Sequence, residues 1–148
     1  MLKAFLNPTN QEISNFLIRQ GPFDLAVTVN LKKRHPNFHI NNSPEIAEKT
    51  GRWFISRLNE NLLRRKYRYK HRQLRTVCSV EKGLVERRLH LHLAIGMPSH
   101  INKAEFIKKI IKIHKKMDWA YGEIHIAPYI NSGWIDYLKK EGFESVLL

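Results

Sequence analysis

The sequence predicts an α+β fold: an antiparallel sheet with helices on one face and an open face on the other. Four segments have the patterns of β-strands, and helical patterns separate them. After a short N-terminal helix the order is strand, helix, strand, strand, helix, strand and a last helix. This is the split βαβ order of ferredoxin-like and RRM-like folds, which often bind nucleic acid on the open face.

A short capped helix precedes the first strand. Thr9 and Glu12 have capping-box spacing, which predicts a helix over residues 9–20 that Gly21-Pro22 ends. Alternation over residues 23–31 then predicts a half-buried strand. Its apolar face carries Phe23, Leu25, Val27, Val29 and Leu31, and its outer face carries Asp24, Ala26, Thr28 and Asn30.

A basic loop over residues 32–42, which we expect to be exposed and to take part in recognition, leads into a long helix. Ser43-Pro44 predicts the helix start, because serine caps a helix and proline fits its first position. In residues 64–72 aromatic side chains interleave with cations, which suits single-stranded nucleic acid. The same pattern is also typical of a solvated, cationic helix end. The residues expected to bind DNA here are Arg64, Arg65, Lys66, Tyr67, Arg68 and Arg72.

The second half of the chain supplies the rest of the sheet and two helices. We expect a strand over residues 74–82, a turn over 83–87 and a strand that ends at Ile95. An amphipathic helix over 99–117, a strand over 122–128 and a helix over 133–141, which Gly142 ends, complete the chain.

Composition indicates one globular domain, residues 1–148, with a polyanionic partner. Hydrophobic residues make up 43% of the chain, enough for a packed core. The chain has 26 Lys and Arg against 13 Asp and Glu, a formal net charge of +13 that favours nucleic-acid binding. The lone cysteine, Cys78, excludes a multi-cysteine zinc site. Without a long apolar run or signal-peptide pattern, we expect a cytoplasmic protein with no membrane partner.

The strand that ends at Ile95 carries two histidines for which a half-buried sheet has no structural need. Its alternation places Arg88, His90 and His92 on the outer face, where Arg88 can also contact DNA. Residues two apart on a strand lie about 6.6 Å apart and point the same way, so two imidazoles can share one metal ion. A His-x-His pattern alone is also typical of structural or incidental histidines.

A carboxylate precedes this pair on the neighbouring strand. If residues 83–86 form a hairpin turn, Glu81 lies beside the two histidines. One carboxylate and two imidazoles with open positions suit Mg²⁺ or Mn²⁺ better than a closed zinc site. The sequence therefore predicts a metal site of His90, His92 and Glu81.

The last helix carries a candidate nucleophile. Tyr137 and Lys140 are three residues apart and share a helix face, whereas Trp134 and Leu138 can dock into the core. A phenol can attack a phosphate ester that a divalent metal polarises, and an ammonium can offset charge in the transition state. An amphipathic surface tyrosine beside ordinary helix lysines explains the same pattern.

Together these motifs resemble those of the HUH endonucleases, and among them the small single-tyrosine replication initiators (Rep proteins) of rolling-circle plasmids, phages and single-stranded DNA viruses. That family has a hydrophobic N-terminal strand, a His-hydrophobe-His strand with an acidic residue on the preceding strand, and a Tyr-x-x-Lys helix. These motifs are matched by Phe23–Val29, by His90-Leu91-His92 with Glu81, and by Tyr137-Leu138-Lys139-Lys140. The order and approximate spacing hold over residues 23–142.

The resemblance implies a metal-dependent nick of single-stranded DNA at a replication origin or hairpin. Tyr137 would attack the scissile phosphate and form a 5′-phosphotyrosyl link, and Lys140 would assist. The predicted metal site would hold Mg²⁺ or Mn²⁺ on that phosphate. The protein would act as a monomer and, since no helicase domain follows, with a separate helicase.

Several alternatives remain open at this point. Glu123 or His125, on the last strand, could replace Glu81 as the third metal ligand. An HUH-type transposase or relaxase would use the same chemistry, and such transposases usually complete their sites across a dimer. Outside enzymes, a non-catalytic module could bind single-stranded nucleic acid on the sheet, although the central strands lack the paired aromatics of RNA-recognition modules.

Overall fold

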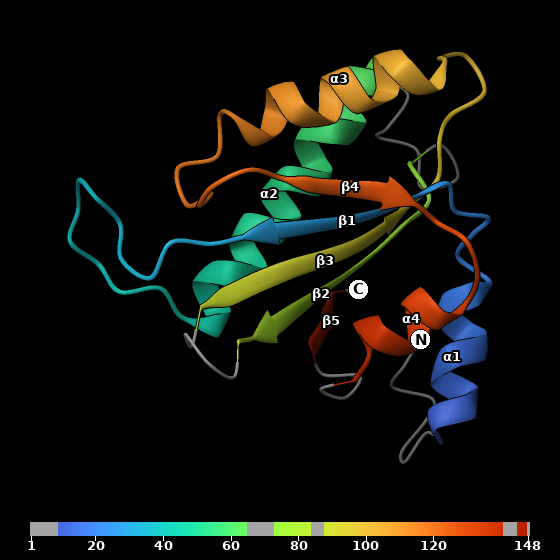
Figure 1. Cartoon of the computed structure of the whole chain (residues 1–148), viewed down its shortest axis with the longest axis horizontal. Helices are drawn as coiled ribbons and strands as arrows, with labels where there is room; N and C mark the ends of the chain where they lie inside the picture. Colours follow the sequence, from blue (N-terminus) through green and yellow to red (C-terminus); the bar gives the residue numbers. More distant parts are fainter. Residues whose placement is uncertain (1–8, 65–72, 84–87, 141–144, 148) are drawn as a thin grey trace.

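The computed structural model describes residues 9–64, 73–83, 88–140 and 145–147, and it confirms the predicted fold class (Figure 1). The described strands are β1 (Leu25–Asn30), β2 (Thr76–Lys82), β3 (Leu89–Ile95), β4 (His125–Pro128) and β5 (Val146–Leu147). They form an antiparallel sheet in the order β4-β1-β3-β2-β5. The first four strands keep the ferredoxin-like order, and the two-residue β5, which was not predicted, extends the sheet beyond β2.

Four helices are described, of which all but α4 begin at a side-chain cap, and two of these caps were predicted. The helices are α1 (Asn10–Ile18), α2 (Pro44–Leu63), α3 (Lys103–His114) and α4 (Gly133–Leu138). Thr9 caps α1 by accepting a hydrogen bond from Glu12 N, and Ser43 caps α2 in the same way. The predicted start of α3 at Ser99 is wrong, because Asn102 caps that helix by accepting from the amide of Glu105.

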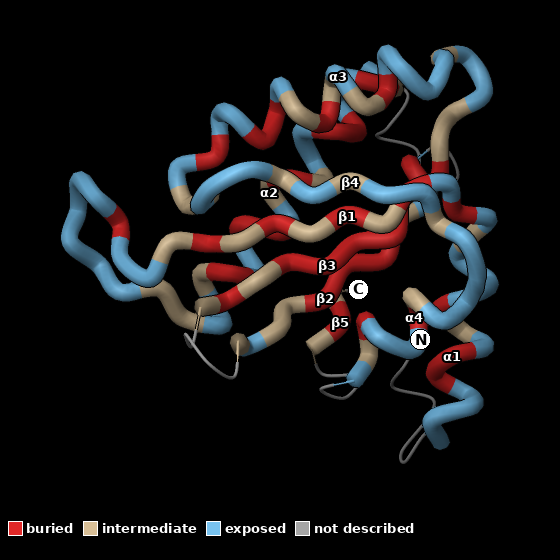
Figure 2. Tube along the Cα trace, viewed as in Figure 1, coloured by how far each residue is buried: buried red, intermediate tan, exposed pale blue. Residues whose placement is uncertain are grey.

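The main core lies between the inner face of the sheet and helices α2 and α3. Figure 2 shows the central strands largely buried and the edge strand β4 exposed. Phe54 of α2, Phe106 of α3 and Leu91 of β3 are fully buried there. Gly51 lets α2 approach the sheet closely, since a Cβ atom at this position would lie 3.4 Å from Cys78 Sγ.

The outer face of the sheet is covered at one end, which differs from the expectation of a wholly open face. Helices α1 and α4 pack there in a second core, on Val77 of β2 and Ala94 of β3. Phe23, which was expected on the inner face, belongs to this second core and contacts Tyr129 edge-on with 5.4 Å between ring centroids. The second core places α4 beside the two histidines.

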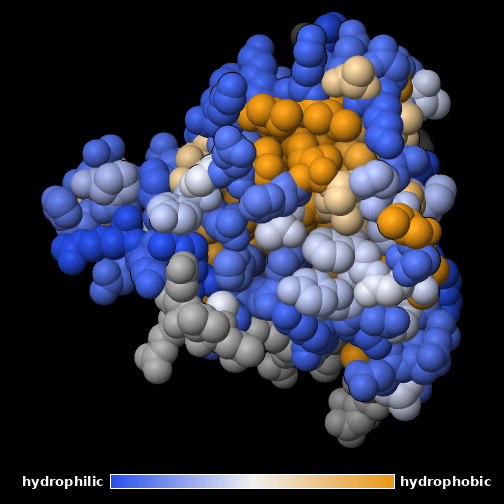
Figure 3. Space-filling model, in the orientation of Figure 1, coloured by the Kyte–Doolittle hydropathy of each residue, from blue (hydrophilic) through white to orange (hydrophobic). Residues whose placement is uncertain are grey.

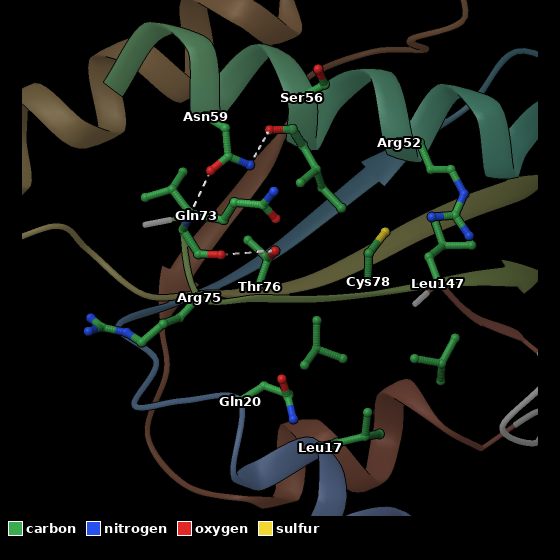
Figure 4. Close-up of a pocket in the computed structure, with 14 residues that line it drawn as sticks. Leu17, Gln20, Arg52, Ser56, Asn59, Gln73, Arg75, Thr76, Cys78 and Leu147 are labelled. Atoms are coloured by element: carbon green, nitrogen blue, oxygen red, sulfur yellow. Dashed lines mark hydrogen bonds between the residues drawn. The ribbon is translucent and has the colours of Figure 1, made fainter. Parts of the chain in front are cut away.

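A hollow of about 630 Å³ lies at the other edge of the sheet, between α1, α2 and the start of β2 (Figure 4). Asn59 of α2 spans its upper end, where it accepts from Leu74 N at 2.7 Å and donates to Ile55 O at 3.0 Å. Among the described residues that line this hollow, none belongs to the predicted metal, catalytic or DNA-binding sets. The hollow is therefore separate from the predicted site residues.

In the part of the chain that the structure describes, no helix has both the length and the apolar composition to cross a membrane.

We expect the Cys78 thiol to react very slowly with a thiol reagent in the native protein. Its side chain is buried under α2, and burial raises its pKa to about 12, so that almost no thiolate forms at neutral pH. Labelling with an aromatic disulfide reagent measures this, and protein in guanidinium chloride is the control. Equally fast labelling in the native and denatured states would contradict the packing of α2 on β2.

Candidate active site

The pairing of the three central strands surrounds the two histidines with polar side chains. In the register of the sheet, Thr28 and Asn30 of β1 lie opposite His92 and His90, respectively. On the other side of β3, Glu81 of β2 lies opposite His90. Because side chains alternate along a strand, all five project from the outer face.

Strand β1 holds both histidine rings through their Nδ1 atoms. His90 Nδ1 lies 2.5 Å from Asn30 Oδ1, and His92 Nδ1 lies 3.1 Å from Thr28 Oγ1. The ring centroids are 6.1 Å apart, and the ring planes are inclined by 24°. Ligating histidines have such contacts, because a hydrogen bond at one ring nitrogen fixes the ring and directs the other nitrogen to the metal.

The Glu81 carboxylate connects the histidine strand to Lys140, which lies in the turn after α4 and not, as predicted, on the helix itself, because α4 ends at Leu138. Its Oε2 contacts His92 Nε2, and its Oε1 forms an ion pair with the Lys140 ammonium. Burial favours a higher pKa for Glu81, but Lys140 and His92 outweigh it and hold the pKa below its usual value. Burial lowers the pKa of His92. An ionised carboxylate beside a neutral imidazole is the protonation state that metal binding requires.

Helix α4 places two stacked aromatic rings against His92. The Tyr137 and His92 centroids are 5.2 Å apart, with the ring planes inclined by 80°. Trp134 stacks on Tyr137 at 5.3 Å and 13°, and its Nε1 donates to the carbonyl oxygen of Leu93 at 2.8 Å. Trp134 therefore fixes the position of the Tyr137 ring.

The Lys140 ammonium lies between the carboxylate and the phenol. It is 4.0 Å from the centre of the Tyr137 ring. A hydrogen bond with Glu81, and after it one with Tyr137, raise the pKa of Lys140, so the side chain stays cationic. A cation at this place can offset negative charge that develops on a bound phosphate.

Helix α1 holds α4 in place from the side away from the histidines. Ser14 Oγ donates to Asp136 Oδ1 at 2.8 Å, and Lys139 Nζ donates to the carbonyl oxygen of Asn10 at 2.6 Å. Ile135 of α4 is completely buried in the second core. The short helix that carries Tyr137 thus depends on α1 for its position.

Removal of the Ser14 hydroxyl should loosen this attachment. We expect Ser14→Ala to lower the free energy of unfolding by about 1 kcal/mol, because a partly buried hydrogen bond to a carboxylate is lost. Urea denaturation followed by tryptophan fluorescence measures the change. Ser56→Ala, at an exposed position on α2, is the matched control. Equal stability of the two variants would contradict the role of this bond.

The predicted ligands have the donor atoms that a divalent ion requires, but their side chains do not point to one shared metal position. Within the described residues, no three or more His, Cys, Asp or Glu side chains are arranged to hold a metal ion. Glu81 instead contacts His92 directly. Two oriented imidazoles and an ionised carboxylate are nevertheless donors that Mg²⁺ or Mn²⁺ accepts. Binding requires Glu81 to exchange its contact with His92 Nε2 for a contact with the ion.

Of the three candidate third ligands, the structure brings Glu81 to the histidine pair. His125 of β4 lies opposite Thr28, so strand β1 separates it from His92 by two strand spacings, about 10 Å. Glu123 precedes β4 and is exposed. The geometry therefore favours Glu81 over both alternatives.

The predicted DNA-binding residues are described only in part. Arg64 is exposed at the end of α2, where its φ is 51°. Arg88 donates to the carbonyl oxygen of Leu31 at 3.2 Å, and its guanidinium lies over the Tyr121 ring, 3.6 Å from the ring centre. Three groups of predicted residues lie outside the described residues: Arg65, Lys66, Tyr67, Arg68 and Arg72; the turn over 84–87; and Glu141 with the terminator Gly142.

Sequence reasoning missed the side chains that orient the site. Alternation along β1 predicted that Thr28 and Asn30 face outward, but only the register of β1 against β3 pairs them with the histidines. Trp134 packs half-buried against the second core, as predicted, but its stacking on Tyr137 was not predicted. A tryptophan three residues before the candidate nucleophile was the available signal.

The geometry of this chain alone defines the candidate site. Searches of protein-family models, curated proteins and solved structures find no match to the chain. What identifies the site is that β2, β3, α4 and the turn after α4 bring Glu81, His92, Tyr137 and Lys140 together, so that each of them contacts two of the others.

Proposed function

We propose that the protein is a metal-dependent endonuclease and strand transferase that nicks and rejoins single-stranded DNA. In this proposal it starts rolling-circle replication of a plasmid or phage in the cytoplasm, as a monomer assisted by a separate helicase. The contact of a phenol, an ammonium, a carboxylate and an imidazole on one sheet face carries the proposal. Packing of an α+β fold does not require these four groups to meet.

Tyr137 supplies the nucleophile. Its phenol oxygen attacks the phosphorus of the scissile phosphodiester and gives its proton to water, and the bond between phosphorus and the 3′ oxygen breaks. One DNA fragment stays on the tyrosine through its 5′ phosphate. The other fragment leaves with a 3′-hydroxyl after its oxygen takes a proton from water. Attack of a 3′-hydroxyl on the phosphotyrosyl ester reverses these steps and rejoins the strand.

Lys140 and the predicted ligands stabilise the charges that develop. The Lys140 ammonium offsets the charge that develops on the phosphate oxygens during attack. His90, His92 and Glu81 would hold Mg²⁺ or Mn²⁺. When bound, this ion would polarise the scissile phosphate and stabilise the leaving oxygen.

The direct test is formation of a covalent protein–DNA adduct. The full chain is incubated with Mn²⁺ and a pool of labelled single-stranded oligonucleotides, and denaturing gels reveal any shifted protein band. We expect an adduct that forms with Mn²⁺ and not with EDTA. Sequencing the attached DNA would also reveal the sequence preferred. Absence of an adduct with every divalent metal would contradict the proposal.

A non-catalytic binding module is the second candidate function. It is favoured by one observation: within the described residues, the donor groups do not converge on a metal position. Such a module would bind single-stranded DNA by charge and stacking without forming an adduct in any metal.

Among enzymes that would use the same chemistry, a replication initiator is favoured over a transposase whose active site is completed by a second chain. Tyr137 lies beside His92 of the same chain, so one chain supplies every group of the proposed site. An active monomer in analytical ultracentrifugation would support this choice, and activity confined to the dimer would contradict it.

Asn30→Ala should weaken the metal site without removing a ligand. Since Asn30 orients His90 through Nδ1, we expect metal affinity and adduct formation to fall about 10- to 100-fold. Titration with Mn²⁺ measures the affinity. Asn61→Ala, at an exposed position on α2, is the matched control and should behave as the wild type. Unchanged metal affinity in Asn30→Ala would contradict its orienting role.

A further inference from the structure

A groove adjoins the candidate active site on the side of the edge strand. It lies between the outer face of β1, β4 and α4, and its volume is about 800 Å³. Thr28 and Tyr137 line it, and both contact His92, so the groove opens onto the candidate nucleophile. Figure 3 shows the main apolar patch of this view between α3 and β4, on the side of β4 away from the groove, and paler, weakly polar surface on the side of α4.

The lining of this groove is uncharged in a strongly basic protein. Among the described residues that line it, none is Lys, Arg, Asp or Glu, although the formal net charge of the chain is +13. Phosphate groups of a nucleic acid gain affinity from cations, which this lining does not offer. Apolar and aromatic surfaces are instead the surfaces on which bases of single strands stack.

One wall of the groove is aromatic and rigid, and the other is aliphatic and exposed. The Trp134 ring is fixed by the Tyr137 ring stacked on one of its faces and by the hydrogen bond from its edge to the main chain of β3. Ile130, which also lines the groove, is 85% exposed and follows the exposed residues Ala127 and Pro128. Such a contiguous apolar area beside a candidate catalytic group is typical of a contact surface.

Hydrogen-bonding side chains at the rim suit the polar edge of a base. His125 and Asn131 both line the groove and are exposed. Each can donate and accept hydrogen bonds, and base edges present both kinds of group. A purely aliphatic ligand would offer these two side chains no hydrogen bond.

We infer that this groove binds the base of a nucleotide next to the scissile phosphate, against Trp134 and Ile130. The inference rests on the proposed function and deepens it, because it divides the substrate between two neighbouring surfaces. The predicted metal site and Lys140 take the phosphate, and the uncharged groove takes the base. Holding the base there would fix the phosphorus in front of the Tyr137 hydroxyl.

Photocrosslinking tests the groove without requiring catalysis. Single-stranded oligonucleotides that carry 5-iodouracil are bound to the full chain in EDTA, irradiated and analysed by peptide mass spectrometry. We expect crosslinks at Trp134 or Tyr129, which line the groove. Crosslinks found only in segments outside the groove would overturn the inference.

A pair of matched variants supplies a second measurement. We expect Ile130→Asn to weaken binding of single-stranded oligonucleotides about five-fold or more, within the range for one stacked base. Because Ile130 is 85% exposed, the change should leave folding intact. Ile18→Asn makes the same change at an exposed position on α1, outside the groove, and should bind as the wild type does. Equal affinities of the two variants would overturn the inference.

Failure of the inference and failure of the proposed function give different results. Metal-dependent adducts at Tyr137, with crosslinks elsewhere and normal affinity of Ile130→Asn, would overturn the base groove and leave the endonuclease. Crosslinks in the groove without an adduct in any metal would support the groove and assign it to a non-catalytic binding module.

Discussion

Tyr137→Phe should abolish covalent attachment of DNA and leave binding of single strands nearly unchanged. The substitution removes the oxygen that would attack phosphorus, and no neighbouring described side chain of α4 offers a replacement hydroxyl at that point. The ring remains, so its stacking on Trp134 and its contact with His92 persist. We expect a loss of adduct of about 10³-fold or more.

The measurement compares two readouts on the same preparations. Denaturing gels report the adduct, and fluorescence anisotropy with EDTA reports binding of single strands. Tyr121→Phe, which makes the same change at an exposed tyrosine outside α4, should form the adduct normally. Normal adduct formation by Tyr137→Phe would assign the nucleophile to another residue and would refute the proposed mechanism. Loss of both readouts would indicate a damaged fold.

The fold was predictable where the pattern is local. Alternating residues in β1 and β3, and the caps Thr9 and Ser43, act within a few residues, and the structure places them as expected. The start of α3 was mispredicted because Ser99 and Asn102 both have capping chemistry, and only the packing of the helix decides between them. Strand β5 was missed because a strand of two residues is too short to show an alternating pattern in the sequence.

The residues of the candidate site were predictable from the sequence, but the contacts between them were not. The spacing of His90 and His92 places them on one face because a strand has a period of two. Register pairs Glu81 with His90, yet its carboxylate reaches diagonally to His92 and to Lys140. The sequence could not predict this choice, because it depends on where α1 and the second core hold α4.

Glu81→Gln should nearly eliminate metal-dependent nicking, whereas Glu123→Gln should have little effect. Glutamine keeps the size of the side chain but removes the charge that a divalent ion needs, while Glu123 is exposed and lies away from the histidine pair. A polarising ion supplies several kcal/mol to the transition state, so we expect a loss of about 10²- to 10³-fold in the nicking rate. Equal losses in the two variants would contradict Glu81 as the third ligand.

Glu81 also pairs with Lys140, so the loss of nicking has two physical explanations that must be separated. Binding of Mn²⁺ without DNA, followed by electron paramagnetic resonance, isolates the first of them. If Glu81 is a ligand, Glu81→Gln weakens Mn²⁺ binding and Lys140→Met does not, although both lower nicking. If the carboxylate serves only to place the ammonium, both variants bind Mn²⁺ like the wild type. The second result would remove Glu81 from the predicted metal ligands and would favour the non-catalytic module.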